Sequence, residues 1–528
     1  MTISRLSIEN FKGVGLRQTV DLAPITLLFG PNSAGKSTIL HALNYLNDIV
    51  CHLDPGSDST HLGEGALDLG GFRQFVHKHD LGKTVVIGID LNLDEIDLYE
   101  SRANRTYRLH YERTGSEKRE SAGLVDISEL TRNINRISFD FRVAWSDFEQ
   151  APYVQRMDIA FEGHRFVKIK ASSDGKRTNI EFLNFGIPVF RRGNSDIFEL
   201  IAVDSITNRH LQEGGHALIG IETARHAIPD WRNPLEISDV WNEDRSYPNA
   251  PLLIDAALQC LIRGSLEALA EELAGLRYLG PLRALPDRNY RPIAGNAENW
   301  ATGLGAWNLL YRNPSLISSV NDWFGNSRLK TGYQIESSDV LELEGRSPLI
   351  GWLQATSLDP NRGAIQEELD RTFKRRRLML RDTNRKDTLV QLNDVGVGIS
   401  QVLPVVVGAL AEEVSLYSIE QPEIHIHPRL QVGLGDLLIH SAKVLGKRFL
   451  IETHSEHVIL RLLKRIREAD ELGEEDSSVF LAEDISVLYV ECVEEETRIS
   501  SLRISQTGRF IDRWPDGFFE ERHGELDA

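Results

Sequence analysis

Gly30-Pro31-Asn32-Ser33-Ala34-Gly35-Lys36-Ser37 is the stretch that decides the fold of this chain. It fits the pattern G-x-x-x-x-G-K-[ST] at every fixed position. The apolar run Ile25–Phe29 directly before it predicts a buried strand, and the apolar periodicity from Ser37 to Val50 predicts a helix after it. A strand, a glycine-rich loop and a helix in this order predict a phosphate-binding cradle.

The residue types of this loop indicate which ligand it binds. Glycines let backbone N–H groups point at phosphate oxygens, Lys36 suits the β- and γ-phosphates, and the Ser37 hydroxyl suits Mg²⁺. We therefore predict ATP and Mg²⁺ as cofactors. A glycine-rich turn that carries a lysine by chance is less consistent with the flanking strand and helix. The residues expected to bind the nucleotide are Gly30, Asn32, Ala34, Gly35, Lys36, Ser37 and Thr38.

Length and composition set the class of protein. A chain of 528 residues is too long for one compact core, so we expect two or more lobes. Its hydrophobic content of 41% is that of an ordinary water-soluble protein. The apolar stretches, such as Ile399–Leu410, are too short to span a bilayer, and Met1 is not followed by a leader pattern. These features predict a cytoplasmic protein without membrane contact.

The cysteine spacing and the net charge indicate which kinds of site and surface the chain can have. Cys51, Cys260 and Cys492 are far apart in the sequence, which predicts neither a disulfide framework nor a zinc site. The net charge of −19 argues against a basic surface overall but permits a local basic tract. Residues Arg371–Lys386 form such a tract. It either contacts the phosphates of a nucleic acid such as DNA, or an acidic partner, or it is the solvated face of a helix balanced by nearby acids, and these interpretations stay open.

The middle of the chain alternates between two patterns. Period-two runs at 84–89, 107–111, 136–141 and 163–171 predict an antiparallel β-lobe laid against the nucleotide-binding half. Apolar residues at helical spacing in Leu252–Leu276 and Trp307–Phe324 predict helices. No long heptad array occurs, so an extended coiled-coil arm is not expected.

The C-terminal third adds polar residues at the ends of two predicted strands. Leu416–Ile419 leads into Glu420, and Arg448–Glu452 leads into Thr453 and His454. Ligands collect at the carboxyl ends of parallel strands, so Glu420 suits magnesium and His454 suits the γ-phosphate. Asn393–Gln401 opens an apolar helix whose amides form a second anion-binding start. Because one nucleotide needs one cradle, the second predicts a homodimer closed over two ATP molecules.

In this order the motifs resemble the ABC-type ATPase heads of SMC, Rad50 and OLD-like proteins. Within that group the chain is most similar to prokaryotic AAA-family ATPases with a DUF3696 C-terminus. The resemblance implies that Gly396, Gly398 and Ser400 belong to the signature loop, Glu420 to Walker B and His454 to the switch. Gln74 is the Q-loop candidate and with Ser37 and Glu420 completes the predicted metal ligands. The stretches that carry the resemblance are Ile8–Gly13, Gly280–Arg283 with Tyr290, Val397–Pro404, Glu420–Pro428, Glu452–His457 and Trp514–Phe519.

The chain departs from these heads at two points. Related heads place Asp then Glu at the end of the Walker B strand, whereas this chain has Glu420 then Gln421. An amide cannot accept a proton from water, so either Glu423 acts as the base or turnover is slow. We hypothesise slow turnover with Glu423 as a partial base. Val487–Glu491 begins like a Toprim nuclease, but no Asp-x-Asp follows, so no intrinsic nuclease is expected.

The predicted fold class is α/β, a bilobal ABC-type P-loop ATPase head with an antiparallel β-lobe. The N-terminal half spans residues 1–100, an inserted β and helical region 101–335, and the C-terminal half 336–528. The resemblance implies a regulatory or sensor ATPase, dimeric or of higher order, that controls a separate effector such as an HNH nuclease in Septu-like anti-phage defence. The alternatives are a Rad50- or SMC-like clamp holding DNA through Arg371–Lys386 and a transporter's nucleotide-binding subunit, which the long insertion disfavours.

Overall fold

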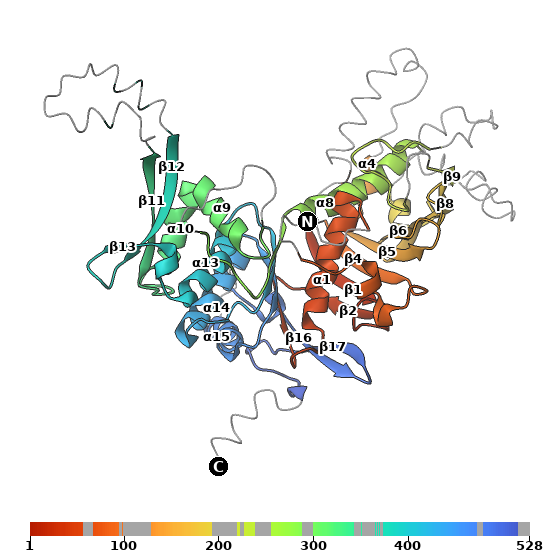
Figure 1. The fold of residues 1–528 in the computed structure, drawn as a ribbon. Helices are drawn as coiled ribbons and strands as arrows, with labels where there is room; N and C mark the ends of the chain where they lie inside the picture. Colours follow the sequence, from red (N-terminus) through yellow and green to blue (C-terminus); the bar gives the residue numbers. More distant parts are fainter. Residues whose placement is uncertain are drawn as a thin grey trace.

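The computed structural model describes residues 1–55, 67–93, 98, 128–192, 219–221, 226–237, 255–287, 299–342, 350, 365, 367, 369, 373–472 and 479–515. Figure 1 shows two lobes that meet at a central sheet, one carrying α1 and the strands β1, β2 and β4–β8, the other carrying α9, α10 and α13–α15. The mixed α/β class and the P-loop between a strand and a helix agree with the sequence-based prediction.

The central sheet has the strand order β10-β14-β15-β3-β16-β17. Neighbouring strands from β10 to β16 run parallel, and β17 runs antiparallel to β16. All residues of β3 are buried, because a parallel strand covered on both faces reads as a continuous apolar run. The strands are β3 Ile25–Phe29, β10 Leu276–Leu279, β14 Leu416–Glu420, β15 Arg448–Glu452, β16 Ile485–Val493 and β17 Glu496–Leu502.

An antiparallel sheet of eight strands, in the order β2-β1-β4-β5-β6-β7-β8-β9, forms the predicted β-lobe. Buried and half-exposed residues alternate along β5, as expected for a sheet with one face toward the core. The predicted strand at 107–111 lies outside the described residues. The strands are β1 Thr2–Glu9, β2 Gln18–Asp21, β4 Val85–Asn92, β5 Arg136–Ser146, β6 Ala151–Phe161, β7 His164–Ala171, β8 Thr178–Leu183 and β9 Ile219–Gly220.

Each face of β3 lies in a separate hydrophobic core. Leu28 joins the core formed by α1, α8 and the antiparallel sheet. Leu27 and Phe29 point the other way, into the core formed by α9, α10 and α13–α15. The helices beside the first core are α1 Lys36–Asn47, which continues into the π-helical turn η1 Asp48–His52, and α8 Gly264–Ala274, which follows the π-helical turn η5 Gln259–Arg263.

The second core shows one correction to the predicted helices. Trp307–Phe324 is not one helix but two, because Pro314 has no N–H to continue a helix and instead starts a new one. Among the residues described, none of the helices combines the length and apolar character that crossing a bilayer requires. The helices of this lobe are α9 Leu304–Arg312, α10 Pro314–Phe324, α13 Val397–Leu410, α14 Pro428–Lys443 and α15 Glu456–Leu472.

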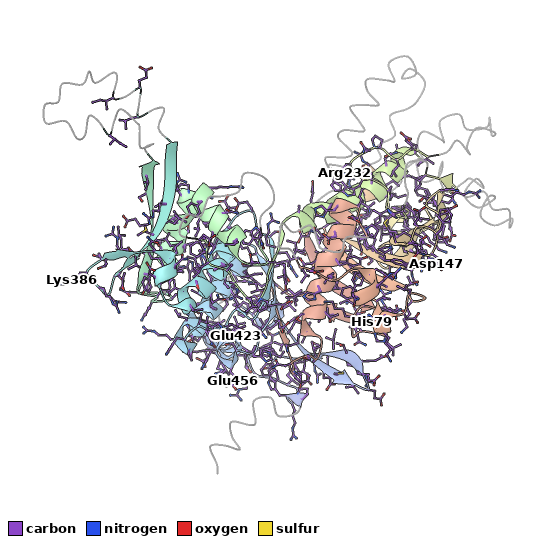
Figure 2. The ribbon with its side chains drawn as sticks, in the orientation of Figure 1. His79, Asp147, Arg232, Lys386, Glu423 and Glu456 are labelled. Atoms are coloured by element: carbon purple, nitrogen blue, oxygen red, sulfur yellow. The ribbon has the colours of Figure 1, made fainter. Side chains whose placement is uncertain are left out.

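The basic tract lies in a third, small sheet of β11 Tyr333–Glu342, β12 Phe373–Asp382 and β13 Thr388–Val390. The part of the tract in β12 is therefore a strand and not the face of a helix. Arg376 donates to Tyr311 O at 2.6 Å, and Arg381 pairs with Glu336. Figure 2 shows Lys386 at the outer edge of this lobe, away from Glu423.

The remaining short elements connect these layers. They are α2 Phe72–Phe75, α4 Ser128–Thr131 and the 3₁₀ turns η2 His77–His79, η4 Pro188–Arg192, η6 Leu392–Asp394 and η7 Ala482–Asp484.

Candidate nucleotide-binding site

The loop between β3 and α1 has the backbone that its glycines predict. Gly30 has φ 144° and Gly35 has φ 99°, values that side-chain-bearing residues rarely adopt. A Cβ at Gly30 would clash with Val490 O, and one at Gly35 would lie 2.5 Å from Thr497 Oγ1. The helix α1 begins at Lys36, directly after the loop, so its first N–H groups lie at the loop.

Lys36 lies inside this loop rather than in solvent. Its side chain is buried, and its ammonium donates to Gly30 O at 3.0 Å and Pro31 O at 2.8 Å. Burial lowers the pKa of Lys36, while the nearby charges of Glu452 and Glu423 oppose that shift. A cation held by loop carbonyls has the position and charge to bind phosphate oxygens.

Glu452 is the carboxylate that contacts the loop directly. Its Oε2 accepts a hydrogen bond from Ser37 Oγ at 2.6 Å, and its Oε1 lies 3.8 Å from Lys36 Nζ. It ends β15, which lies between β14 and β3 in the sheet. The sequence predicts this strand end, but Glu452 is not among the predicted metal ligands. The signal was available, since a carboxylate at the end of a buried strand is also what identified Glu420.

Glu420 is held by a set of side chains from distant parts of the chain. Its Oε1 accepts from Tyr278 Oη at 2.7 Å and lies 3.1 Å from His41 Nε2. The other ring nitrogen of His41 contacts Lys12 Nζ. Burial alone raises the pKa of Glu420, but the His41 and Tyr278 hydrogen bonds and the charge of Lys12 outweigh it, so the pKa is lowered. Lys12 lies in Ile8–Gly13, one of the stretches that carry the resemblance, but no motif singles out His41 or Tyr278 in the sequence.

Glu423 holds the turn that follows β15. Its Oε2 accepts from Thr453 Oγ1 at 2.8 Å, and its Oε1 accepts from the backbone N–H of His454 at 2.6 Å. Burial raises the pKa of Glu423. Burial, with the positive charge of Lys36, lowers the pKa of His454. The structure thus brings Glu423 and His454 together beside Lys36.

The backbone directly after β14 has a positive φ at Gln421 and is held by hydrogen bonds from neighbouring elements. Gln421 has φ 44°, and its N–H donates to Glu452 O at 2.7 Å. Arg283, which lies in one of the stretches that carry the resemblance, donates to Glu420 O at 2.8 Å and to Gln421 O at 3.2 Å. The same guanidinium donates to Gln401 O at 3.1 Å. Arg283 therefore connects the end of β14 to α13.

The predicted signature residues lie at the first turn of α13. Gly396 is exposed, with nothing within 4 Å of where a Cβ would be, and Val397 is 55% exposed. A Cβ at Gly398 would lie 2.9 Å from His425 O. Ser400 is buried and donates to Val397 O at 2.7 Å. The start of α13 is open at Gly396 and Val397, whereas the Ser400 hydroxyl faces inward.

The remaining predicted residues differ in their exposure. Gln74 is exposed on α2, and its backbone N–H donates to Gly71 O within its own turn. Asn32 is exposed on the loop, and Ala34 and Thr38 are buried beside it. The role of Gln74 as a metal ligand remains a prediction.

The donor set fits a magnesium ion that is bound together with a nucleotide. In the described part of the chain, no three His, Cys, Asp or Glu side chains converge as they would around an all-protein metal site. Mg²⁺ usually keeps several waters and takes one or two carboxylates plus phosphate oxygens. Ser37 and Glu452, joined at 2.6 Å, and the ionised Glu420 supply that kind of set.

Comparison with solved structures gives weak similarity to SMC head domains. An SMC head bound to the C-winged helix domain of ScpA has a TM-score of 0.38 at 10% identity, covering 96% of this chain and 99% of that one. The SMC head of Thermotoga maritima gives 0.36 at 9% identity, covering 96% and 100%. The SMC head of Pyrococcus yayanosii gives 0.37 at 9%, covering 95% and 97%. TM-scores this low support no functional inference.

Sequence families are more informative. No curated protein shows a significant match. The family described as "Protein of unknown function (DUF3696)" matches residues 482–528. The family described as "AAA ATPase domain" matches residues 1–135 and 327–459, together just over half of the chain. The chain therefore belongs to the AAA ATPase domain family.

Proposed function

We propose that this chain is a regulatory ATPase in which two copies close over Mg–ATP and control a separate effector. The observation that supports this best is the arrangement at the loop, where Lys36 lies among loop carbonyls and Ser37 joins Glu452. When bound, the nucleotide supplies the phosphates, and the metal neutralises their charge.

Each residue of the site has a role in this proposal. Lys36 binds phosphate oxygens, and Ser37 holds the metal with Glu452 and Glu420. His454 lies in the turn after β15, where it can contact the terminal phosphate. Gln421 occupies the position where related heads have a glutamate, so hydrolysis is slow and the closed dimer persists. Glu423 acts as a partial base, although both of its oxygens also accept hydrogen bonds from residues 453 and 454.

The exposed start of α13 supports the dimer. A helix of 14 residues presents its first N–H groups, beside exposed Gly396 and Val397, with no contact within 4 Å of a Gly396 Cβ position. Helix starts bind anions, so this one can complete the nucleotide site of a second copy. The division into 1–100, 101–335 and 336–528 remains part of the proposal. Strands of the eight-stranded sheet come from both of the first two regions.

The nucleotide site is tested by variants of the loop. Lys36→Ala should weaken ATP affinity by roughly two orders of magnitude, because it removes charge-assisted hydrogen bonds. Glu420→Gln should retain binding and lower hydrolysis at least about tenfold. Exposed Lys386→Ala is the matched control and should behave like wild type. ATP affinity in Lys36→Ala equal to that of wild type would refute the site.

Effector control is tested by co-purification. A nuclease of HNH type encoded beside this chain should bind it, and its activity should follow the ATP state. Activity of the chain alone on nucleic acid would contradict this division of labour. The defence role rests on family resemblance alone.

DNA clamping by the basic tract is the second candidate. The described residues Arg377 and Lys386 are exposed, whereas Arg376 and Arg381 contact the chain itself. Binding that weakens steeply with salt, and less steeply in Arg377→Ala, would favour the clamp.

A further inference from the structure

The hairpin of β16 and β17 lies directly against the strand that leads into the phosphate loop (Figure 1). β16 pairs with β3 in parallel, from Ile485 opposite Ile25 to Tyr489 opposite Phe29. One residue further along, Val490 O occupies the space that a side chain at Gly30 would need. The hairpin lies within the segment 482–528. This segment therefore supplies one wall of the loop.

Thr497, in β17, joins this wall to the loop by hydrogen bonds. Its Oγ1 donates to Ala34 O at 3.0 Å, and its backbone N–H donates to Gly13 O at 2.8 Å. Thr497 is buried, so water does not compete for these bonds. Two glycines make room for it, because a Cβ at either Gly35 or Gly13 would collide with Thr497 Oγ1.

The bond to Ala34 O determines which way the next N–H points. No cis peptide bond occurs among the described residues, which include the loop, and a trans peptide carries its C=O and the following N–H on opposite sides. Because Thr497 holds Ala34 O toward the hairpin, the N–H of Gly35 points away from the hairpin. Inward-pointing N–H groups are what a glycine-rich loop offers to phosphate.

A second contact lies where the loop begins, at the end of β3. Trp514 packs edge-to-face on Phe29, with ring centroids 5.2 Å apart, and Phe29 is the residue before Gly30. Phe510 packs on the same Trp514 at 4.9 Å. The segment after β17 therefore returns to the strand end from which the loop departs. The two contacts hold the loop at Phe29, the residue before it, and at Ala34, within it.

We propose that Thr497 is a positioning residue that holds the peptide between Ala34 and Gly35 in its phosphate-accepting orientation, and that the C-terminal hairpin supports the loop. This inference rests on the proposed function, because it takes the loop to bind nucleotide. It assigns a task to the segment whose family has no described function.

The test compares Thr497→Val, which replaces the hydroxyl with a methyl group, with Thr497→Ser, which keeps the hydroxyl. Two quantities are measured: the affinity for Mg–ADP, and the hydrogen exchange of amides in residues 30–37 without nucleotide. The Val variant should bind ADP about fivefold more weakly, the effect of one neutral hydrogen bond, and exchange faster in the loop. The Ser variant should match wild type. Exposed Ser501→Ala, also in β17, is the matched control.

Wild-type affinity and exchange in the Val variant would overturn the proposal, as would an equal loss in the Ser variant. If the Val variant does not fold, Thr497→Ser and Thr497→Ala give the same comparison, since both lack the methyl group. Lys36→Ala distinguishes failure of the proposed nucleotide site from failure of the proposed role of Thr497. If it binds ADP like wild type, the proposed nucleotide site fails, while exchange in the nucleotide-free Thr497 variants still tests the support of the loop.

Discussion

Glu452 is a buried carboxylate with acidic neighbours. Burial raises its pKa, the charges of Glu420 and Glu423 add to the rise, and the Ser37 hydrogen bond and the charge of Lys36 only partly offset it. Without a bound cation, ionisation of Glu452 is therefore less favourable in the folded protein than in the unfolded chain. Active sites often keep such charges because the bound ligand compensates them.

Glu452→Gln should accordingly stabilise the metal-free protein while it impairs hydrolysis. A carboxyl with a raised folded pKa contributes stability below its unfolded pKa, and that contribution is lost as pH rises through the folded pKa. The variant should thus gain about 1 kcal/mol over wild type at neutral pH and nothing below about pH 4. Urea unfolding in EDTA at several pH values measures the gain. A gain that is independent of pH would contradict the electrostatic explanation.

The residues around Glu420 show the limit of prediction at this scale. Lys36, Ser37, Glu420 and His454 were predictable because each belongs to a short motif or ends a strand. Lys12, His41 and Tyr278 belong to separate segments, and although Lys12 lies in the motif stretch Ile8–Gly13, nothing in the sequence assigns any of the three to Glu420. Only the fold brings them to one carboxylate.

At the scale of elements, Arg283 links a strand to a helix. It is buried, and donates to the carbonyls of Glu420 and Gln421 after β14 and of Gln401 in α13. Gln401 Nε2 returns a hydrogen bond to Arg283 O at 3.0 Å. Since α13 begins at the predicted signature loop, this link sets where that loop lies relative to Glu420 at the end of β14.

Arg283→Lys should destabilise the protein by about 2 kcal/mol, because an ammonium cannot reproduce the fork of donors and leaves buried carbonyls unpaired. It should also lower ATP hydrolysis more than ATP affinity, because the substitution does not change β3 or α1, which flank the phosphate loop. Chemical unfolding and nucleotide binding measure the two effects. Arg377→Lys, at an exposed position of β12, is the control. A variant as stable as wild type would show that the link is dispensable.

The elements themselves were predictable where a pattern is local. β3, β14 and β15 are mostly apolar, β14 and β15 each end at a glutamate, and the structure confirms all three as strands. The place of β10 and β16 in the same sheet depends on pairing across hundreds of residues, which no local pattern reports. The basic tract was interpreted as a possible helix face because the run of arginines hides the alternation of residues along strand β12. Pro314, in contrast, was a readable helix boundary.

At the scale of the molecule, the central sheet separates two hydrophobic cores that pack different helices. One core packs α1 against the β-lobe, and the other packs α13 to α15 beneath the carboxyl ends of β14 and β15. β3 belongs to both, so in the proposed function its loop is the point where both lobes would contact the nucleotide. A second copy that binds through α13 would therefore contact one lobe and sense the other through the nucleotide.

Val397→Asp tests this assembly without disturbing the monomer. An acidic residue at the first position of a helix is favourable, so the variant should fold as well as wild type. In a dimer, the same charge would face the partner's triphosphate and weaken association at least about tenfold. In a Glu420→Gln background with Mg–ATP, light scattering should show the mass double for the parent and stay monomeric for Val397→Asp, with ATP affinity of the monomer unchanged. Leu460→Asp is the control, because Leu460 on α15 is also 55% exposed. A Val397→Asp protein that still doubles in mass would place the dimer contact away from α13.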